Sequence, residues 1–141
     1  MVRKEANTQR KIKEQTSTGS NEALKKAILA AEAQTEKKAE DIVVIDVRDV
    51  CTFSDYFVIC TGLSSLQFKA IADSIESSLR KMGFKPYHID GLTSQSWLIM
   101  DYSDVIIHVF SPEARSYYEL ERLWGDGTFI DWESEHKKIH S

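Results

Sequence analysis

Two short runs of apolar residues constrain the fold of this chain most strongly. Residues 42–45 read Ile-Val-Val-Ile and residues 56–60 read Tyr-Phe-Val-Ile-Cys, so neither run contains a charged side chain. Apolar runs of this length without polar alternation are typical of strands that are buried on both faces. Such strands lie in the centre of a sheet covered by helices, and the sequence therefore predicts an α/β fold.

Three helices are expected to cover this sheet, and their expected ranges are 21–38, 64–83 and 111–125. Their first residues, Asn21, Ser64 and Ser111, have side chains that can cap the first turn of a helix. Apolar residues within each range recur at the spacing of one helical face. Glycines near the ends of the second and third ranges supply a residue type that terminates helices.

Three short strands are expected between the second and third helices, at residues 85–89, 96–102 and 104–110. The last two are joined by so few residues, around Ser103, that they should form an antiparallel hairpin. The predicted order is therefore α-β-β-α-β-β-β-α. We expect one domain over residues 21–130, with a mixed five-stranded sheet and helices packed on it.

Charged residues are unevenly distributed along the chain. The whole sequence has 18 Lys and Arg residues against 22 Asp and Glu residues, a formal charge of −4, which argues against a general DNA- or RNA-coating protein. Residues 1–20 nevertheless carry five bases and two acids and lack apolar periodicity, so we expect a flexible basic tail that could touch RNA weakly. Residues 131–141 are polar and are expected to form a C-terminal tail.

The sequence also indicates a cytoplasmic protein. No apolar run approaches the roughly 20 residues that span a bilayer, and the N-terminus has no apolar core of the signal-peptide type. Cys51 and Cys60 have neither a disulfide framework nor the spacing of metal ligands. Both lie in apolar surroundings, so we expect buried, reduced thiols.

Searching for catalytic motifs gives one candidate cluster, Asp101, Asp104 and His108 around the predicted hairpin. Period-two geometry places Asp104 and His108 on one face of their strand, and the three groups could bind a divalent ion or transfer a proton, as in a metal-dependent nucleotidyl or phosphoryl transferase. We favour the alternative, in which the aspartates form the turn and His108 is a hydrogen-bonded sheet residue. No cofactor and no metal are predicted, because the sequence has no phosphate-binding glycine loop and no zinc-ligand spacing.

Aromatic and acidic residues interleave in the second half of the chain. Residues 84–124 contain six acids and three bases. On the strand expected at 96–102, Trp97 and Asp101 share one face, and a large aromatic beside a carboxylate is typical of a binding patch for a basic partner. The alternative is that Trp97 is a core residue, and the pattern by itself leaves the two interpretations equal.

Several motifs, taken in order, resemble one known family. In the first half they are Ala39-Glu40-Asp41-Ile42, Ser54-Asp55-Tyr56-Phe57-Val58-Ile59 and Thr61-Gly62-Leu63-Ser64-Ser65. In the second half they are Asp90-Gly91, the run WLIMDYSDV from Trp97, His108-Val109-Phe110 and the run RSYYELERLW from Arg115. With this spacing, over residues 22–125, the sequence resembles the Iojap family, whose bacterial members are called ribosomal silencing factors (RsfS). The family often has glycine where this chain has Ser103.

The resemblance implies a protein that is not an enzyme. It implies binding to the free large ribosomal subunit through that subunit's protein number fourteen, which would block joining of the small subunit and repress translation. It also implies a nucleotidyltransferase-like fold without the catalytic signature, and we find no Gly-Ser with paired aspartates on adjacent predicted elements. A contact of the basic N-terminal tail with ribosomal RNA, and a homodimer formed through exposed sheet surface, are alternatives that the sequence leaves open.

The resemblance and the acidic, aromatic segment point to the same region, because ribosomal proteins at the subunit interface are basic. We expect the partner-binding residues to be Trp97, Leu98, Asp101, Tyr102, Asp104, Tyr118 and Glu121. The apolar members would supply buried contact area and the carboxylates would meet Lys or Arg side chains. Leu98 and Tyr102 lie opposite Trp97 on an ideal strand, so all three can face a partner only if the strand twists or bulges.

Overall fold

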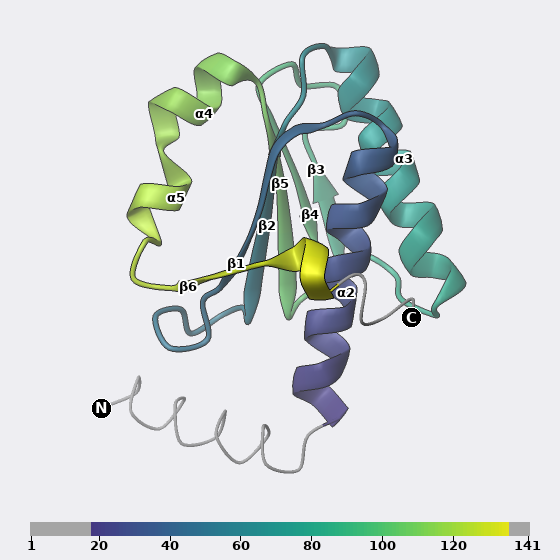
Figure 1. The fold of residues 1–141 in the computed structure, drawn as a ribbon. Helices are drawn as coiled ribbons and strands as arrows, with labels where there is room; N and C mark the ends of the chain where they lie inside the picture. The colour runs from purple at the N-terminus through teal and green to yellow at the C-terminus, as the bar shows by residue number, and fades with distance from the viewer. Residues whose placement is uncertain (1–17, 136–141) are drawn as a thin grey trace.

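The computed structural model describes residues 18–135, which form one mixed sheet with helices on both faces (Figure 1). The strands are β1 (Glu40–Asp46), β2 (Tyr56–Thr61), β3 (His88–Asp90), β4 (Trp97–Asp101), β5 (Val105–Phe110) and β6 (Thr128–Ile130), in the order β3-β4-β5-β2-β1-β6. The helices are α2 (Thr18–Glu36), α3 (Ser65–Lys81), α4 (Pro112–Tyr118) and α5 (Leu120–Leu123). The predicted α/β architecture is therefore confirmed.

The centre of the sheet is the parallel pair β2 and β5. All six residues of β2 are buried, as its apolar sequence predicted, and β2 pairs with β5 in parallel and with β1 antiparallel. The predicted hairpin is confirmed, because β4 and β5 pair antiparallel across the turn at Ser103. The sheet has six strands and not five, since the short strand β6 pairs with β1 and forms an edge.

The helices depart from the predicted ranges at two places. Helix α2 begins at Thr18, so the last three residues of the expected tail are helical, whereas residues 1–17 of that tail lie outside the described residues. The third predicted helix is divided at Glu119, whose φ of 47° is left-handed and ends α4 before α5 begins. Across this break Arg115 donates from Nε and Nη2 to the two carboxylate oxygens of Glu121, at 3.1 and 2.8 Å.

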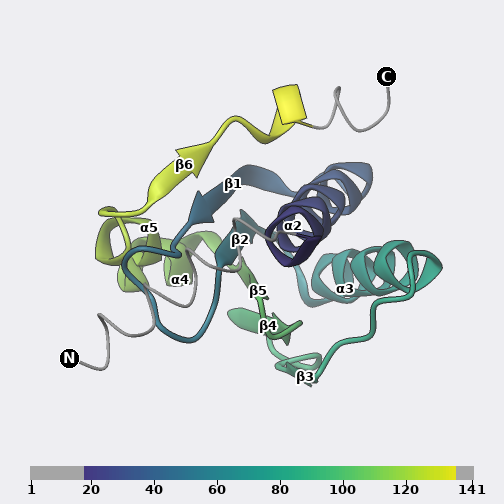
Figure 2. The same ribbon diagram turned by 90° about the horizontal axis from the view of Figure 1, so that it is seen from below.

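The two faces of the sheet are covered unequally (Figure 2). Helices α2 and α3 lie on one face, over a core that includes Val58, Leu98 and Ile107. Helices α4 and α5 lie on the other face, over a smaller core that includes Phe57 and Phe110. These two short helices do not extend over β3, so part of the second face carries no helix from the described part of the chain (Figure 2).

The expected C-terminal tail is packed against the domain at Trp132. The expected tail covers residues 131–141, but Trp132 is half-buried and packs against the larger core. Residues 136–141 of that tail lie outside the described residues. No helix within the described part of the chain is long and apolar enough to cross a membrane.

Both cysteines are buried and free, as expected. Burial raises the pKa of the Cys60 thiol to about 12, so this thiol stays protonated at neutral pH.

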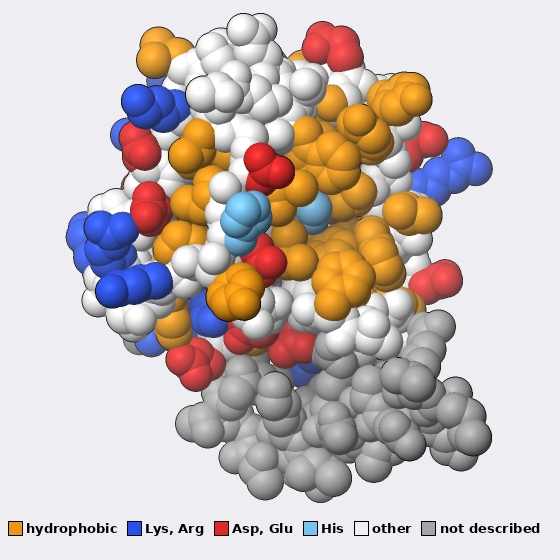
Figure 3. Space-filling view, turned by 180° about the vertical axis from the view of Figure 1, so that it is seen from behind, with side chains coloured by type: hydrophobic (Ala, Val, Ile, Leu, Met, Phe, Trp, Pro, Cys, Tyr) orange, Lys and Arg blue, Asp and Glu red, His pale blue; other side chains and the backbone are white. Residues whose placement is uncertain are grey.

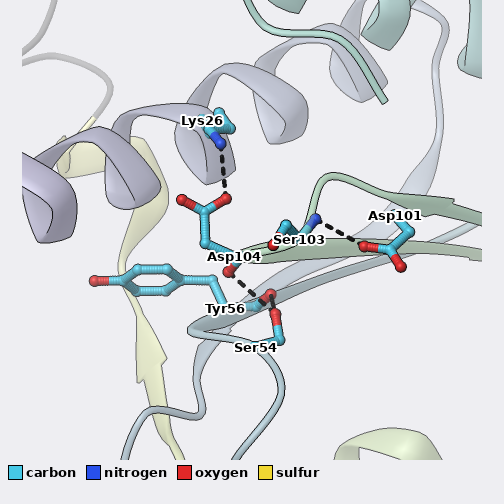
Figure 4. Close-up of polar contacts among 6 residues, drawn as sticks. All are labelled: Lys26, Ser54, Tyr56, Asp101, Ser103 and Asp104. Carbon is cyan, nitrogen blue, oxygen red and sulfur yellow. Dashed lines mark hydrogen bonds and ion pairs between the residues drawn. The ribbon is translucent and has the colours of Figure 1, made fainter. Parts of the chain in front are cut away.

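The turn between β4 and β5 is fastened to helix α2 (Figure 4). Lys26 Nζ donates to Asp104 Oδ1 at 2.7 Å and lies 4.7 Å from the ring centroid of Phe84. Ser54 Oγ donates to the backbone oxygen of Asp104 at 3.0 Å, which joins the turn to the segment before β2. The carboxylate of Asp104 therefore points to the face covered by α2, and the expectation that Asp104 shares a face with His108 is wrong.

This ion pair gives a first prediction. Replacing Lys26 by Met keeps the aliphatic stem but leaves the partly buried Asp104 carboxylate without its cation, which should lower the free energy of unfolding by about 1–3 kcal/mol. Asp104→Ala should cost a similar amount. The double variant should lose less than the sum of the two single variants, measured by urea denaturation. Strict additivity would contradict a direct interaction between the two side chains.

Two glycines give a second prediction, because both have left-handed backbone angles but different surroundings. Gly83 has φ 88° with nothing within 4 Å of an added Cβ, whereas Gly91 has φ 89° and a Cβ added there would clash with the Trp97 carbonyl oxygen. Gly83→Ala should destabilise the protein by about 1 kcal/mol through backbone strain alone. Gly91→Ala should cost at least about 2 kcal/mol more, through overpacking against β4. Equal losses in urea denaturation would show that β4 moves away freely.

Candidate partner-binding face

The uncovered part of the second sheet face is formed by the side chains that alternate with the buried ones on β4. Along this strand Leu98 and Met100 are buried against α2 and α3, whereas Trp97, Ile99 and Asp101 are half-exposed on the opposite side. Directly paired residues of β3 and β5 share this side. We call this surface the open face, and its exposed or half-exposed sheet residues are His88, Asp90, Trp97, Ile99, Asp101 and Ile106, whereas His108 and Phe110 on the same side are buried.

Trp97 is the centre of the aromatic contacts on the open face. Its ring centroid lies 4.6 Å from that of Tyr118 on α4, 5.0 Å from Phe110 and 5.9 Å from His108. Tyr117 packs edge-on against Tyr118 at 5.0 Å and is 79% exposed. The aromatic side chains of the sheet and those of α4 therefore form one contiguous surface.

A second group of rings continues this surface toward α5. Phe57 contacts His108 and Trp124, each with a centroid distance of 5.3 Å, and Trp124 contacts Phe53 at 6.1 Å. Phe53 is 60% exposed. Figure 3 shows hydrophobic side chains gathered on this side of the molecule, with acidic and histidine side chains among them. Contiguous exposed apolar surface rimmed by polar groups is typical of protein interaction sites.

His108 lies beneath these rings and is hydrogen-bonded, as the favoured interpretation expected. Trp97 Nε1 donates to His108 Nδ1 at 3.1 Å. Burial lowers the pKa of His108 to about 4, because the charged imidazolium would be desolvated, so the side chain is neutral at pH 7. Its Nε2 atom is buried and has no hydrogen-bond partner among the described residues.

The three residues of the catalytic candidate are not brought together. Asp104 points to Lys26 on α2, His108 bonds Trp97 on the open face, and Asp101 Oδ1 accepts from the backbone N–H of Ser103 at 2.7 Å. Asp101 therefore stabilises the turn, in which Ser103 has a left-handed φ of 73°, the conformation that glycine favours. Within residues 18–135 no group of three or more His, Cys, Asp or Glu residues is placed to hold a metal ion.

Two of the expected partner-binding residues are buried on the sheet face that α2 and α3 cover. Leu98 is fully buried and Tyr102 is 3% exposed, both in the core beneath α2 and α3, because β4 keeps regular alternation and has no bulge. Burial raises the pKa of Tyr102 to about 12. Neither side chain can contact a partner in this structure, and both assignments are corrected.

The other expected residues divide into two groups. Trp97, Asp101 and Tyr118 lie on or beside the open face. Asp104 and Glu121 instead form ion pairs within the protein, with Lys26 and Arg115 respectively. The sequence reasoning missed the residues that complete the surface, and these are Phe53, His88, Asp90, Ile99, Ile106 and Tyr117. Period-two alternation on residues 96–102 was sufficient to place Ile99 on the same face as Trp97. Phe53 and Tyr117 lie on other segments of the chain, so no local pattern joins them to this surface.

Comparison with known proteins identifies the family. Residues 20–141 match the model of RsfS, described as ribosomal silencing factor during starvation. Ribosomal silencing factor RsfS of Bacillus subtilis is 40% identical over 103 residues, which are 73% of this chain and 87% of the relative. Chloroplastic Iojap of Zea mays is 36% identical over 78% of this chain and 48% of that protein. Mitochondrial assembly of ribosomal large subunit protein 1 of Mus musculus is 34% identical over 68% of this chain and 43% of its own length.

The fold is also similar to a solved structure. A crystal structure of a protein from Chromobacterium violaceum matches with a TM-score of 0.69 and 34% sequence identity, covering 72% of this chain and 84% of that one. The sequence match and the shared fold agree with the resemblance that the motifs indicated. The chain therefore belongs to the ribosomal silencing factor (RsfS) family, which includes Iojap relatives.

Proposed function

We propose that this protein binds the large ribosomal subunit through the subunit's protein number fourteen and that it thereby blocks joining of the small subunit. Membership of the RsfS family supports a role in regulating translation at the ribosome. The name of the mouse relative, which refers to assembly of the ribosomal large subunit, supports the choice of subunit. The action is repression of translation and requires no chemical step.

The open face is the observation that carries this proposal. Trp97 and Tyr118 form its aromatic centre, where half-exposed rings can lose their remaining exposure against a partner. Asp90 and Asp101 lie on β3 and β4, on the same side of the sheet as Trp97. A surface of rings with carboxylates at its rim is complementary to a basic protein, and ribosomal proteins at the subunit interface are basic.

Steric exclusion then follows from occupancy. A protein bound where the two subunits meet occupies volume that the small subunit requires, so the two binding events are mutually exclusive. The fraction of large subunits unable to join equals the fraction bound, which is set by the concentration of this protein relative to its Kd. Repression would therefore scale with the amount of the protein.

Binding through the open face gives a third prediction. Trp97→Ala should weaken co-sedimentation with purified large subunits by at least about tenfold, because it removes the central ring. Asp101→Asn, which removes the charge but keeps the oxygen that accepts from Ser103, should weaken binding by about two- to fivefold and reduce its salt dependence.

Asp73→Asn is the matched control, because Asp73 is an exposed acid on α3, on the opposite side of the sheet. This variant should bind like the wild type. Equal weakening by Asp73→Asn and Asp101→Asn would contradict docking through the open face. A wild-type protein that sediments with joined ribosomes as well as with free large subunits would contradict steric exclusion.

Exclusion of the small subunit gives a fourth prediction. Large subunits preincubated with the protein should join small subunits to an extent that falls in proportion to their occupancy, measured by light scattering after mixing. Trp97→Ala should require at least about tenfold more protein for the same inhibition. Full binding without any inhibition of joining would place the protein away from the subunit interface.

A further inference from the structure

A buried histidine lies beneath the open face, and steric exclusion assigns it no role. His108 is 6% exposed, and its Nδ1 accepts a hydrogen bond from Trp97 Nε1 at 3.1 Å. We propose that His108 is a positioning residue. Its hydrogen bond to Trp97 fixes the orientation in which the indole ring meets the partner. This inference rests on the proposed function, since it takes Trp97 as a binding residue.

The hydrogen bond defines which nitrogen of His108 carries the proton. An indole N–H can only donate, so Nδ1 of His108 is unprotonated and Nε2 carries the hydrogen. Desolvation by burial lowers the pKa of His108 to about 4, so this acceptor is present throughout the neutral pH range. The indole N–H of Trp97 therefore keeps its hydrogen-bond acceptor on β5 across this pH range.

The same imidazole lowers stability because one of its nitrogens has no hydrogen-bond partner among the described residues. Its Nε2 is buried and has no acceptor among the described residues, and a buried donor without an acceptor is rare in folded proteins. Phenylalanine rings flank the imidazole, with Phe57 edge-on at 5.3 Å and Phe110 stacked at 5.9 Å. A third phenylalanine would suit these surroundings without an unsatisfied donor. Packing alone therefore does not explain a histidine here.

Orientation matters because the two edges of an indole ring are different. The torsion that rotates the tryptophan ring about its attachment is broad and roughly two-fold, so packing between flat rings permits a flipped orientation. Trp97 contacts Tyr118 at 4.6 Å and Phe110 at 5.0 Å, and neither of these ring contacts involves Nε1 in a hydrogen bond. The hydrogen bond to His108 favours the orientation in which Nε1 points toward β5.

Two substitutions separate positioning from packing. His108→Phe keeps an aromatic ring of similar size but removes the acceptor, and it should weaken large-subunit binding about five- to tenfold, with a Tm equal to or above that of the wild type. His108→Asn retains a side-chain oxygen near the position of Nδ1, so it should recover part of the lost affinity although it packs less well. A purely structural histidine would show loss of binding and loss of Tm together.

The indole N–H signal of Trp97 reports the hydrogen bond in the free protein. The chain has three tryptophans, whose indole signals are separated in a nitrogen–proton correlation spectrum and assigned with Trp97→Phe. In His108→Phe the Trp97 signal should shift and exchange faster with solvent. Because Trp97→Phe already removes the donor, His108→Phe should cause no further loss of binding in that background.

Several results would overturn the proposal. These are wild-type affinity in His108→Phe, equal losses of affinity in the wild-type and Trp97→Phe backgrounds, or an indole signal that does not change. Failure of the proposal alone leaves binding of the wild-type protein intact. Failure of the wild-type protein to bind large subunits would contradict the proposed function and this inference with it, and that result is seen before any substitution is made.

Discussion

Helices cover the two faces of the sheet unequally, and the open face that we propose as the binding surface depends on this inequality. The long helices α2 and α3 pack along one face, whereas within residues 18–135 the other face carries only the short helices α4 and α5 (Figure 2). The left-handed residue Glu119 separates these two helices, and Arg115 holds the break closed through Glu121. The two short helices cover Phe57 and Phe110 and contact Trp97 at the start of β4, but Ile99 and Asp101 of that strand remain half-exposed.

The uncovered strand has two different faces, which explains how one segment contributes both to the core and to a surface. Leu98 and Met100 are fully buried, and burying such side chains contributes about 1.5–3 kcal/mol each. Trp97 and Asp101, which alternate with them, are only half-buried and keep part of their surface exposed. The buried face of β4 thus contributes to the core, and the half-exposed face carries the side chains that we propose to contact the partner.

Local patterns in the sequence were sufficient for the elements that depend on local interactions. The buried strand β2, the cap of α3 at Ser64 and the hairpin at Ser103 were all predicted from neighbouring residues. The three-residue strand β6 was missed because it exists only through pairing with β1. The break at Glu119 was missed because no glycine or proline marks it.

The site was predictable only in part, for the same reason. Alternation placed Trp97 and Asp101 on one face, and the structure agrees. The list also included Leu98 and Tyr102, which alternation placed on the opposite face and which are buried there. The pairing of Asp104 with Lys26 joins residues 78 positions apart, which no local pattern contains.

Oxidative footprinting tests most directly whether the open face meets the ribosome. Hydroxyl radicals modify exposed aromatic and sulfur-containing side chains, and mass spectrometry measures the rate at each residue with and without purified large subunits. The account predicts that modification of Trp97, Tyr117 and Tyr118 falls on binding, whereas Met82 at the end of α3, which is also exposed, is modified at an unchanged rate. Protection of Met82 with unchanged modification of Trp97 and Tyr118 would contradict the account, because it would place the partner on the helix-covered face.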